Sequence, residues 1–283
     1  TLEIAIPPLS TQRKIGAILS AYDDLIENNL RRIKILEEMA QLVYREWFVN
    51  FRFPGHENAK MVESGVGPIP GGWEIKKVED VAILHRGKSY RSLDLIDEGG
   101  LPFLNLKCID RGGGFRYDGI KRFQGEFKED QTAKPNDIVI AVTDMTQERR
   151  LVAHAARVPD IGEQLAVMSM DLVRVEPTAE VPKEYLYAMF RFSGFSDTVK
   201  QHANGANVLH LNPERIMDFK FVLAPEELRN RYSAICANLY QLADVLHLKD
   251  ATLHRTRDLL LPKLISGGLD VSQLDIDIGE EPA

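Results

Sequence analysis

The chain has 283 residues, of which 44% are hydrophobic, and it carries a formal net charge of −7. This length supplies enough apolar material for a globular core and for two structural units. No run of about 18 or more apolar residues occurs, so the sequence predicts no membrane span. The start, "TLEIAIPPLS", lacks an initiator Met and a signal-peptide core. It reads as the end of a strand, so we expect a fragment of a longer protein.

The charge is unevenly distributed along the chain. The tail "GLDVSQLDIDIGEEPA" holds five acidic residues and no basic one, so the remainder carries only −2. Between His85 and Arg122, eight Lys or Arg face five Asp or Glu. This is a modest basic patch. Net charge therefore neither indicates nor excludes a nucleic-acid partner.

The first predicted element after residues 1–9 is a long helix over residues 10–52. Its apolar residues recur at alternating steps of three and four, which is typical of a helix seam. Ser10 is a plausible N-cap. The predicted seam comprises Ile15, Ile18, Tyr22, Leu25, Asn29, Ile33, Leu36, Ala40, Val43 and Trp47. Asn29 is either a device that fixes the register of a helix pair or a tolerated polar position.

A linker follows at residues 53–72, rich in Gly and Pro, and then a mixed domain at residues 73–224. We predict strands in "WEIKKVEDVAIL", "NDIVIAVTD" and "SMDLVRVEP", and a helix over "PKEYLYAMFRFSGFSDTVKQH". A final short strand, "DFKFVLAP", leads into a second long helix at residues 225–266, and residues 267–283 form the acidic tail.

The second helix repeats the first at an offset of 217 residues. Pro8 and Pro225 align before the two starts, where proline is tolerated. The ten aligned seam positions are Tyr232, Ile235, Leu239, Leu242, Leu246, Asp250, Leu253, Arg257, Leu260 and Leu264. Eight of them are again apolar, and the exceptions are Asp250 and Arg257. A narrow apolar stripe cannot be buried by one helix alone. We therefore predict an α+β fold in which two long helices, flanking a mixed domain, pair as an antiparallel coiled coil; the alternative is that each helix packs on its own globular domain.

The sequence offers no catalytic or metal constellation. "AILHRGKS" resembles a phosphate-binding loop, but Ala82 stands where the first glycine is needed. The cysteines, Cys108 and Cys236, lack zinc or disulfide spacing, which fits a reducing cytoplasm. We therefore expect a non-catalytic chain without a metal.

Three segments carry a family resemblance. The family is that of the specificity (S) subunits of type I restriction–modification systems. Its central conserved region resembles "PPLSTQRKIGAILSAYDDLIENNLRRIKILEEMAQLVYREWFVNF". The entry to its second target-recognition domain resembles "GVGPIPGGWEIKKVEDV", and its C-terminal end resembles "LLPKLISGGLDV". A full subunit of this family has two recognition domains, and this chain resembles its C-terminal half. The resemblance implies a spacer of two helical arms, partner methyltransferase (M) and restriction (R) subunits, double-stranded DNA, and S-adenosylmethionine, ATP and Mg on the partners with no cofactor on this chain. It also leaves room for self-association of the fragment.

Loops of the mixed domain contain the candidate DNA contacts, because phosphates attract Lys and Arg while base edges suit Arg, Asn and Gln. The candidates are Arg86, Lys88, Tyr90, Arg91, Lys107, Arg111, Arg116, Tyr117, Lys121, Arg122, Thr146, Gln147, Arg149, Arg150, Asn204, Asn207 and His210. Each could instead be an ordinary solvated side chain. An interaction scaffold with a coiled-coil arm and a partner other than DNA remains the alternative function, and a methyltransferase is the weakest.

Overall fold

The computed structural model describes residues 7–276 of the chain. It divides into two compact units, one of residues 1–37 with 241–283 and the other of residues 38–240. Residues 1–6 and 277–283, which include most of the predicted first strand and part of the acidic tail, lie outside the described residues. Within residues 7–276, no helix combines the length and hydropathy needed to cross a bilayer.

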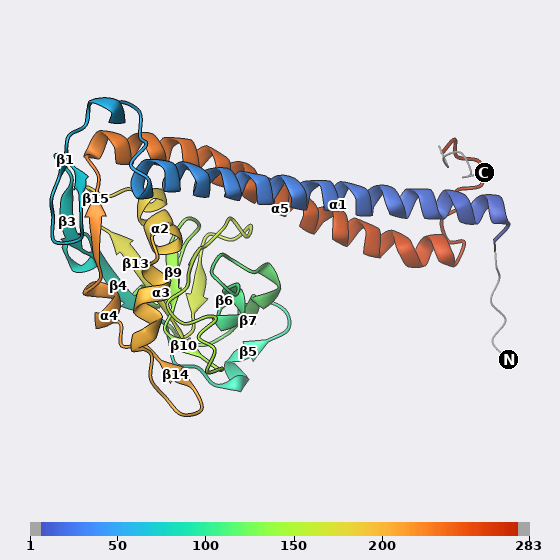
Figure 1. The fold of residues 1–283 in the computed structure, drawn as a ribbon. Helices are drawn as coiled ribbons and strands as arrows, with labels where there is room; N and C mark the ends of the chain where they lie inside the picture. The colour runs from blue at the N-terminus through green and yellow to red at the C-terminus, as the bar shows by residue number, and fades with distance from the viewer. Residues whose placement is uncertain (1–6, 277–283) are drawn as a thin grey trace. The chain divides into compact units, whose positions relative to one another are not determined.

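Two long helices dominate the architecture (Figure 1). Helix α1 spans Leu9–Tyr44 and continues as one π-helical turn over Arg45–Val49. Helix α5 spans Glu226–Ile265, and its first turn carries Glu226 and Glu227. Acidic side chains stabilise this end because the helix dipole is positive there.

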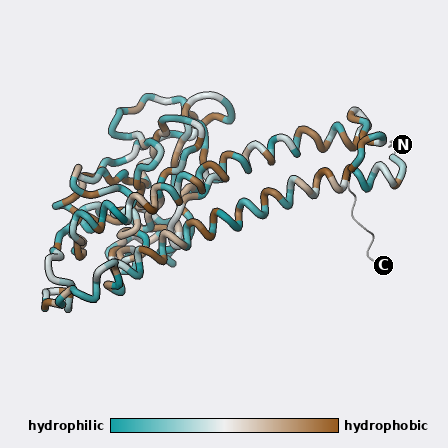
Figure 2. Tube along the Cα trace, turned by 90° about the horizontal axis from the view of Figure 1, so that it is seen from above, coloured by the Kyte–Doolittle hydropathy of each residue, from teal (hydrophilic) through white to brown (hydrophobic). Residues whose placement is uncertain are grey.

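In the first unit, α1 and α5 lie side by side and run in opposite directions. Asn29 Nδ2 donates a 2.6 Å hydrogen bond to Asp250 Oδ1. Six residues nearer the start of α1, Asp23 pairs with Arg257 at 2.6 Å, and Arg257 lies farther along α5 than Asp250. The contact that lies earlier in α1 is made by a residue that lies later in α5, which requires the two helices to run antiparallel. The predicted antiparallel pairing is therefore confirmed. Figure 2 shows apolar residues recurring along both helices.

The predicted seam is displaced by one residue at three places. Leu25 is 53% exposed while its neighbour Ile26 is 5% exposed. On α5, Leu242 is exposed whereas Ala243 is buried. Ile235 is also exposed, and the adjacent Cys236 is buried in the core of the second unit. Those three seam assignments are wrong, because a 3.6-residue helix drifts against a repeat of 3.5 and the partner helix selects the covered neighbour.

The other predicted seam residues are covered in whole or in part. Ile33, Tyr232 and Leu246 are buried. The partly buried members are Ile15, Ile18, Tyr22, Asn29, Leu36, Val43, Leu239, Leu253 and Leu260.

The two polar exceptions in the second seam are the residues that contact α1. Asp250 is only 5% exposed and accepts from Asn29, while Arg257 pairs with the more exposed Asp23. The apolar repeat is thus interrupted where a cross-helix polar contact is made. Asn29 therefore has a specific partner, as a residue that fixes register requires.

Within residues 38–240, the second unit contains fifteen strands. Their bounds are β1 Met61–Val62, β2 Ile69–Pro70, β3 Glu74–Lys77, β4 Ala82–Arg86, β5 Leu95–Ile96, β6 Leu101–Leu104, β7 Lys121–Phe123, β8 Thr132–Ala133, β9 Ile138–Ala141, β10 Thr143–Asp144, β11 Ala155–Arg157, β12 Ala166–Met168, β13 Leu172–Pro177, β14 Leu209–His210 and β15 Lys220–Leu223. Its short helices are α2 Lys183–Phe192, α3 Phe195–Val199 and α4 Glu214–Met217.

Two larger sheets organise these strands. The first has the order β11-β9-β13-β4 and is antiparallel throughout. The second has the order β5-β7-β6-β12-β8, and its β6–β12 pair is parallel. Two-stranded pairs β15–β3, β10–β14 and β1–β2 complete the sheets. The fold is therefore a mixed α+β domain with a pair of long helices, as predicted.

Three predicted elements are each divided in the structure. The strand expected over residues 136–144 becomes β9 and β10, which belong to different sheets. The strand expected over residues 73–84 becomes β3 and β4, separated by a 3₁₀ turn at Val78–Asp80, and the two strands pair in different sheets. The helix expected over residues 182–202 becomes α2 and α3 because Gly194 adopts a φ of 82°, which ends α2 and redirects the chain.

An aromatic cluster inside the second unit joins the last turns of α1 and the first turns of α5 to α2 and to Trp73, which precedes β3. The Phe48 ring lies 5.0 Å from that of Tyr185 on α2 and 5.3 Å from that of Tyr232 on α5. Trp73 lies 5.9 Å from Phe48. Such edge-to-face pairs add about 0.5–1.5 kcal/mol each beyond area burial. The adjoining helix ends are thus part of this unit's core.

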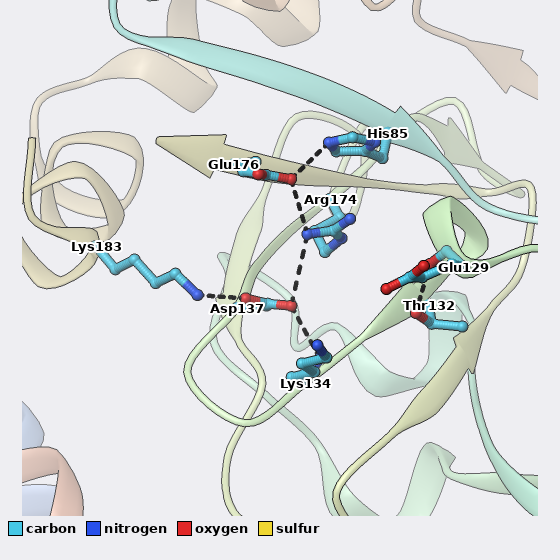
Figure 3. A network of polar contacts seen from close by, with 8 residues as sticks. All are labelled: His85, Glu129, Thr132, Lys134, Asp137, Arg174, Glu176 and Lys183. Carbon is cyan, nitrogen blue, oxygen red and sulfur yellow. Dashed lines mark hydrogen bonds and ion pairs between the residues drawn. The ribbon is translucent and has the colours of Figure 1, made fainter. Parts of the chain in front are cut away.

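A polar network braces the first sheet against α2 (Figure 3). Asp137 is 4% exposed and contacts Lys183 Nζ at 2.5 Å and Arg174 Nη1 at 3.9 Å. Arg174 also pairs with Glu176 at 3.2 Å, and His85 Nε2 lies 2.7 Å from the same carboxylate. The network spans β4, β13, the turn before β9 and the start of α2. It therefore stabilises the sheet from which the loops at residues 86–91 and 145–150 extend.

Candidate nucleic-acid interface

The loop at residues 145–150 is shaped by one buried carboxylate at the end of β10. Asp144 is 1% exposed and accepts hydrogen bonds from Leu151 N at 2.7 Å and from Thr146 N and Oγ1 at 2.9 and 3.0 Å. Burial by itself raises the pKa of Asp144, but these hydrogen bonds outweigh it and hold the pKa below its ordinary value. A charged Asp144 therefore fixes the loop that presents Gln147, Arg149 and Arg150.

A second candidate loop, at residues 204–210, lies against the first. Strand β10 pairs with β14 so that Thr143 faces His210. Gln147 Nε2 donates to the carbonyl oxygens of Gly205 and Ala206 at 3.2 and 2.9 Å. Asn204, Asn207 and His210 remain exposed beside this contact. Gln147 therefore connects the loop at residues 145–150 to the loop at residues 204–210.

The glycine loop at residues 112–114 reaches the same region from another side. All three glycines have positive φ, between 84° and 98°. Gly112 N donates to Arg150 O at 3.3 Å, and Gly114 N donates to Ala155 O at 2.9 Å. Only glycine adopts this backbone at no steric cost. The triple glycine therefore places Arg111 next to the 145–150 loop.

The loop at residues 86–91 is connected to these loops through Asp171. Lys88 N donates to Met168 O at 2.7 Å, and Met170 N donates back to Lys88 O at 2.8 Å. Asp171 then accepts from Thr143 Oγ1 at 2.9 Å, at the base of the 145–150 loop. A side chain at Gly87 would overlap the Ser169 carbonyl oxygen, so this close approach requires glycine. The structure thus brings parts of all four candidate segments together around β10.

Arg122 has a different role from the one expected. Its Nε and Nη2 donate to the carbonyl oxygens of Gly99 and Gly100 at 2.7 and 2.6 Å, and its Nη1 pairs with Glu163. The guanidinium is engaged by three groups of its own chain and braces the turn before β6. We therefore remove Arg122 from the candidate set, because these donors have partners already.

The remaining candidates differ in how far they are engaged. Arg91 pairs with Asp94 at 3.4 Å but its side chain is 81% exposed. Arg116 pairs with Asp118, and the Tyr117 ring lies 5.3 Å from that of Phe115. Tyr90 packs its ring 4.7 Å from Phe103. The exposed candidates with a basic side chain are Arg86, Arg91, Lys107, Arg111, Arg116, Lys121 and Arg150, whereas Lys88 and Arg149 are partly buried.

Sequence reasoning missed the two acids that position these loops. Asp144 and Asp171 are neither basic nor amide residues, so a search for basic and amide side chains passes over them. Their position in the sequence was the available signal. Each carboxylate stands at the edge of a buried apolar run, where it needs hydrogen-bond donors from the surrounding chain. Within residues 7–276, no group of three His, Cys, Asp or Glu is arranged to hold a metal ion.

The fold and the loops define a class: a mixed α+β domain that exposes basic and amide loops and is joined to an antiparallel helix pair. No family model matches the chain. A solved S subunit of a type I restriction–modification system from M. genitalium has the same fold, with a TM-score of 0.60 and 16% identity over 90% of this chain and 61% of that one.

Curated relatives cover nearly the whole chain. It is 23% identical over 281 residues to the type I restriction enzyme MjaIX specificity subunit of Methanocaldococcus jannaschii, covering 96% of this chain and 62% of the relative. It is 19% identical to the HindI specificity subunit of Haemophilus influenzae, over 94% of this chain. The resemblance to type I specificity subunits that the sequence motifs indicate is therefore confirmed. The chain spans about three fifths of the length of the first of these relatives.

Proposed function

We propose that this chain is the part of a type I specificity subunit that reads one half of a bipartite DNA target. The second unit reads the half-site, and the paired helices act as the spacer arm. In this proposal the chain catalyses no step: M subunits methylate with S-adenosylmethionine, and an R subunit uses ATP and Mg to translocate and cleave. In the same proposal the chain corresponds to the C-terminal half of such a subunit, with residues 73–224 as its recognition domain and residues 10–52 and 225–266 as the spacer arms.

The observation that carries the proposal is the convergence of the loops around β10. The 145–150 loop, which carries Arg150, contacts the 204–210 loop, which carries Asn204 and Asn207, through Gln147 and the β10–β14 pair, and Asp171 connects the base of the 145–150 loop to the segment that pairs with Lys88. DNA readers combine phosphate and base contacts, because phosphate contacts fix position and base contacts select sequence. A relative named as a specificity subunit supports the same assignment.

The helix pair supports partner binding. Within the first unit, one groove is lined by Leu25 of α1 and by Val245, Leu248 and Leu253 of α5, and Leu25 and Val245 are 53% and 41% exposed. An exposed apolar patch that two helices share is typical of a protein contact surface. We assign this surface to the M subunits. If the domain proves not to bind DNA, the scaffold alternative would assign the same surface to another protein.

The test is duplex binding as a function of salt. The triple variant Arg86→Ala/Lys88→Ala/Arg91→Ala removes three cations from one loop. Each lost phosphate contact lowers the slope of log K against log salt by about 0.9, so three lost contacts lower it by about 2.7. The matched control, Lys128→Ala/Lys134→Ala/Lys220→Ala, removes three exposed lysines outside the loops and should leave the slope unchanged.

Two results would contradict the proposal. If the parent chain binds duplex DNA without salt dependence, or not at all, the scaffold alternative is favoured. If both triple variants lower the slope equally, binding follows net charge and the loops are not the interface. Mapping methylated adenines in cells that carry the full-length subunit with its partners would then identify the sequence read.

A further inference from the structure

A basic cavity of about 460 Å³ opens beside the loop cluster in the second unit. Its volume falls within the range of ligand pockets, roughly 300–1,000 Å³. The cations that line it are Arg45, Arg111, Arg149, Arg150, Arg191 and Lys200. Two acids oppose them, Glu148 and Asp197. The lining therefore carries an excess of four positive charges, with His154 counted as neutral.

Arg191 is held in place before any ligand arrives. Its Nη1 donates to the Gly112 carbonyl oxygen, and its guanidinium lies 5.3 Å from the centroid of the Phe192 ring. A side chain at Gly113 would collide with this guanidinium and with the Ala155 carbonyl oxygen at 2.9 Å. Glycine at position 113 therefore leaves the space that the Arg191 side chain occupies.

Two charged groups at the cavity have unmet hydrogen-bonding capacity. The Nε atoms of Arg149 and Arg191 are buried and have no acceptor within the described part of the chain. Arg149 also has a φ of 53°, a conformation that non-glycine residues seldom adopt. Buried donors without acceptors are costly, and backbone strain of this kind gathers at ligand sites.

The charges around the cavity favour a negatively charged ligand. Burial lowers the pKa of His154, and the positive charges of Lys200 and Arg191 lower it further. The imidazole is therefore held neutral while the neighbouring cations remain charged. An anion in the cavity would supply acceptors for the buried N–H groups and offset the positive excess.

We propose that this cavity holds one backbone phosphate of the DNA duplex and so anchors the domain beside the bases that its loops read. The inference rests on the proposed function. Arg149 and Arg150 belong to both the cavity wall and the 145–150 loop, whose other end contacts the 204–210 loop through Gln147. A phosphodiester in the cavity would therefore lie next to the recognition loops, and the planar guanidinium of Arg191 suits two phosphate oxygens.

The experiment uses cavity residues that lie outside every candidate recognition loop. Arg45 is exposed, and Lys200 is partly buried and pairs with an exposed Asp197, so the variant Arg45→Gln/Lys200→Gln should fold normally. We expect it to lower the slope of log K against log salt for a non-specific duplex by about 0.9, the value for one phosphate. The charge-matched control Lys128→Gln/Lys220→Gln should keep the parental slope.

The outcomes separate the cavity from the wider proposal. An unchanged slope in the cavity variant, with salt-dependent duplex binding in the parent, overturns the cavity assignment and leaves the proposed function intact. No duplex binding by the parent overturns both. A second arm adds inorganic phosphate at matched ionic strength: if phosphate raises the melting temperature of the parent but not of the variant, while the duplex slope is equal in both, the cavity is a small-anion site and the DNA assignment is wrong.

Discussion

Replacing Asn29 with leucine should destabilise the helix pair of the first unit strongly. Asn29 Nδ2 donates the 2.6 Å hydrogen bond to Asp250 Oδ1, while Asp250 Oδ2 is buried without a partner within the described residues. A hydrogen bond to a charged group contributes about 1.5–3 kcal/mol, and a buried charge left unpaired costs about 3–5 kcal/mol. Because Asp250 is 5% exposed, water can replace little of the lost bond. We expect the free energy of unfolding to fall by about 3 kcal/mol.

The measurement is urea denaturation followed by circular dichroism at 222 nm, with two comparison variants. Asp23→Ala removes the partner of Arg257, but the two side chains are 58% and 27% exposed, so the loss should be about 0–1 kcal/mol. The double variant Asn29→Leu/Asp250→Leu should recover stability, because replacing a buried polar pair by apolar residues is often neutral or stabilising. If Asn29→Leu costs no more than Asp23→Ala, the buried contact does not hold the helices and our account of the seam is wrong.

Three further predictions follow from the same geometry. A four-residue insertion beside Asn29 lengthens α1 by about 6 Å and breaks the hydrogen bond between Asn29 and Asp250. A matched insertion beside Asp250 should restore stability and, in the full-length subunit, widen the gap between methylated half-sites by about one or two base pairs. An active variant with an unchanged gap would contradict the role of the helices as a spacer. The variant Asp144→Asn should lower the free energy of unfolding by about 1–3 kcal/mol at pH 7. Because the pKa of Asp144 is lowered in the folded state, its contribution to stability is lost as the pH falls through that pKa. In urea titrations the difference between the variant and the parent should therefore shrink by pH 3. Burial raises the pKa values of Cys108 and Cys236 to about 12, so a thiol reagent at pH 7 should label them only as the protein unfolds, and fast labelling of the native chain would refute this.

The loop cluster could be predicted only as a set of separate candidates. Loops at residues 86–91, 112–114, 145–150 and 204–210 are distant in sequence, and nothing local states that they meet. The β10–β14 pair, the bridge through Asp171 and the glycine turns bring them together. The same tertiary contacts remove Arg122 from the set and add Arg191, whose place on α2 gave no sequence signal of a basic cavity.

The sequence by itself determined the two long helices and their pairing, because a seam that repeats at an offset of 217 residues is a local pattern written twice. It could not choose between adjacent apolar residues such as Leu25 and Ile26, since either satisfies the spacing and only the partner helix covers one of them. It also read β3 and β4 as one strand, since alternation does not reveal that a turn at Val78–Asp80 sends the two halves to different sheets. Periodicity is a property of a single segment, whereas register, sheet membership and the meeting of loops depend on free energies shared between segments far apart in the chain, and these were decided by the tertiary structure.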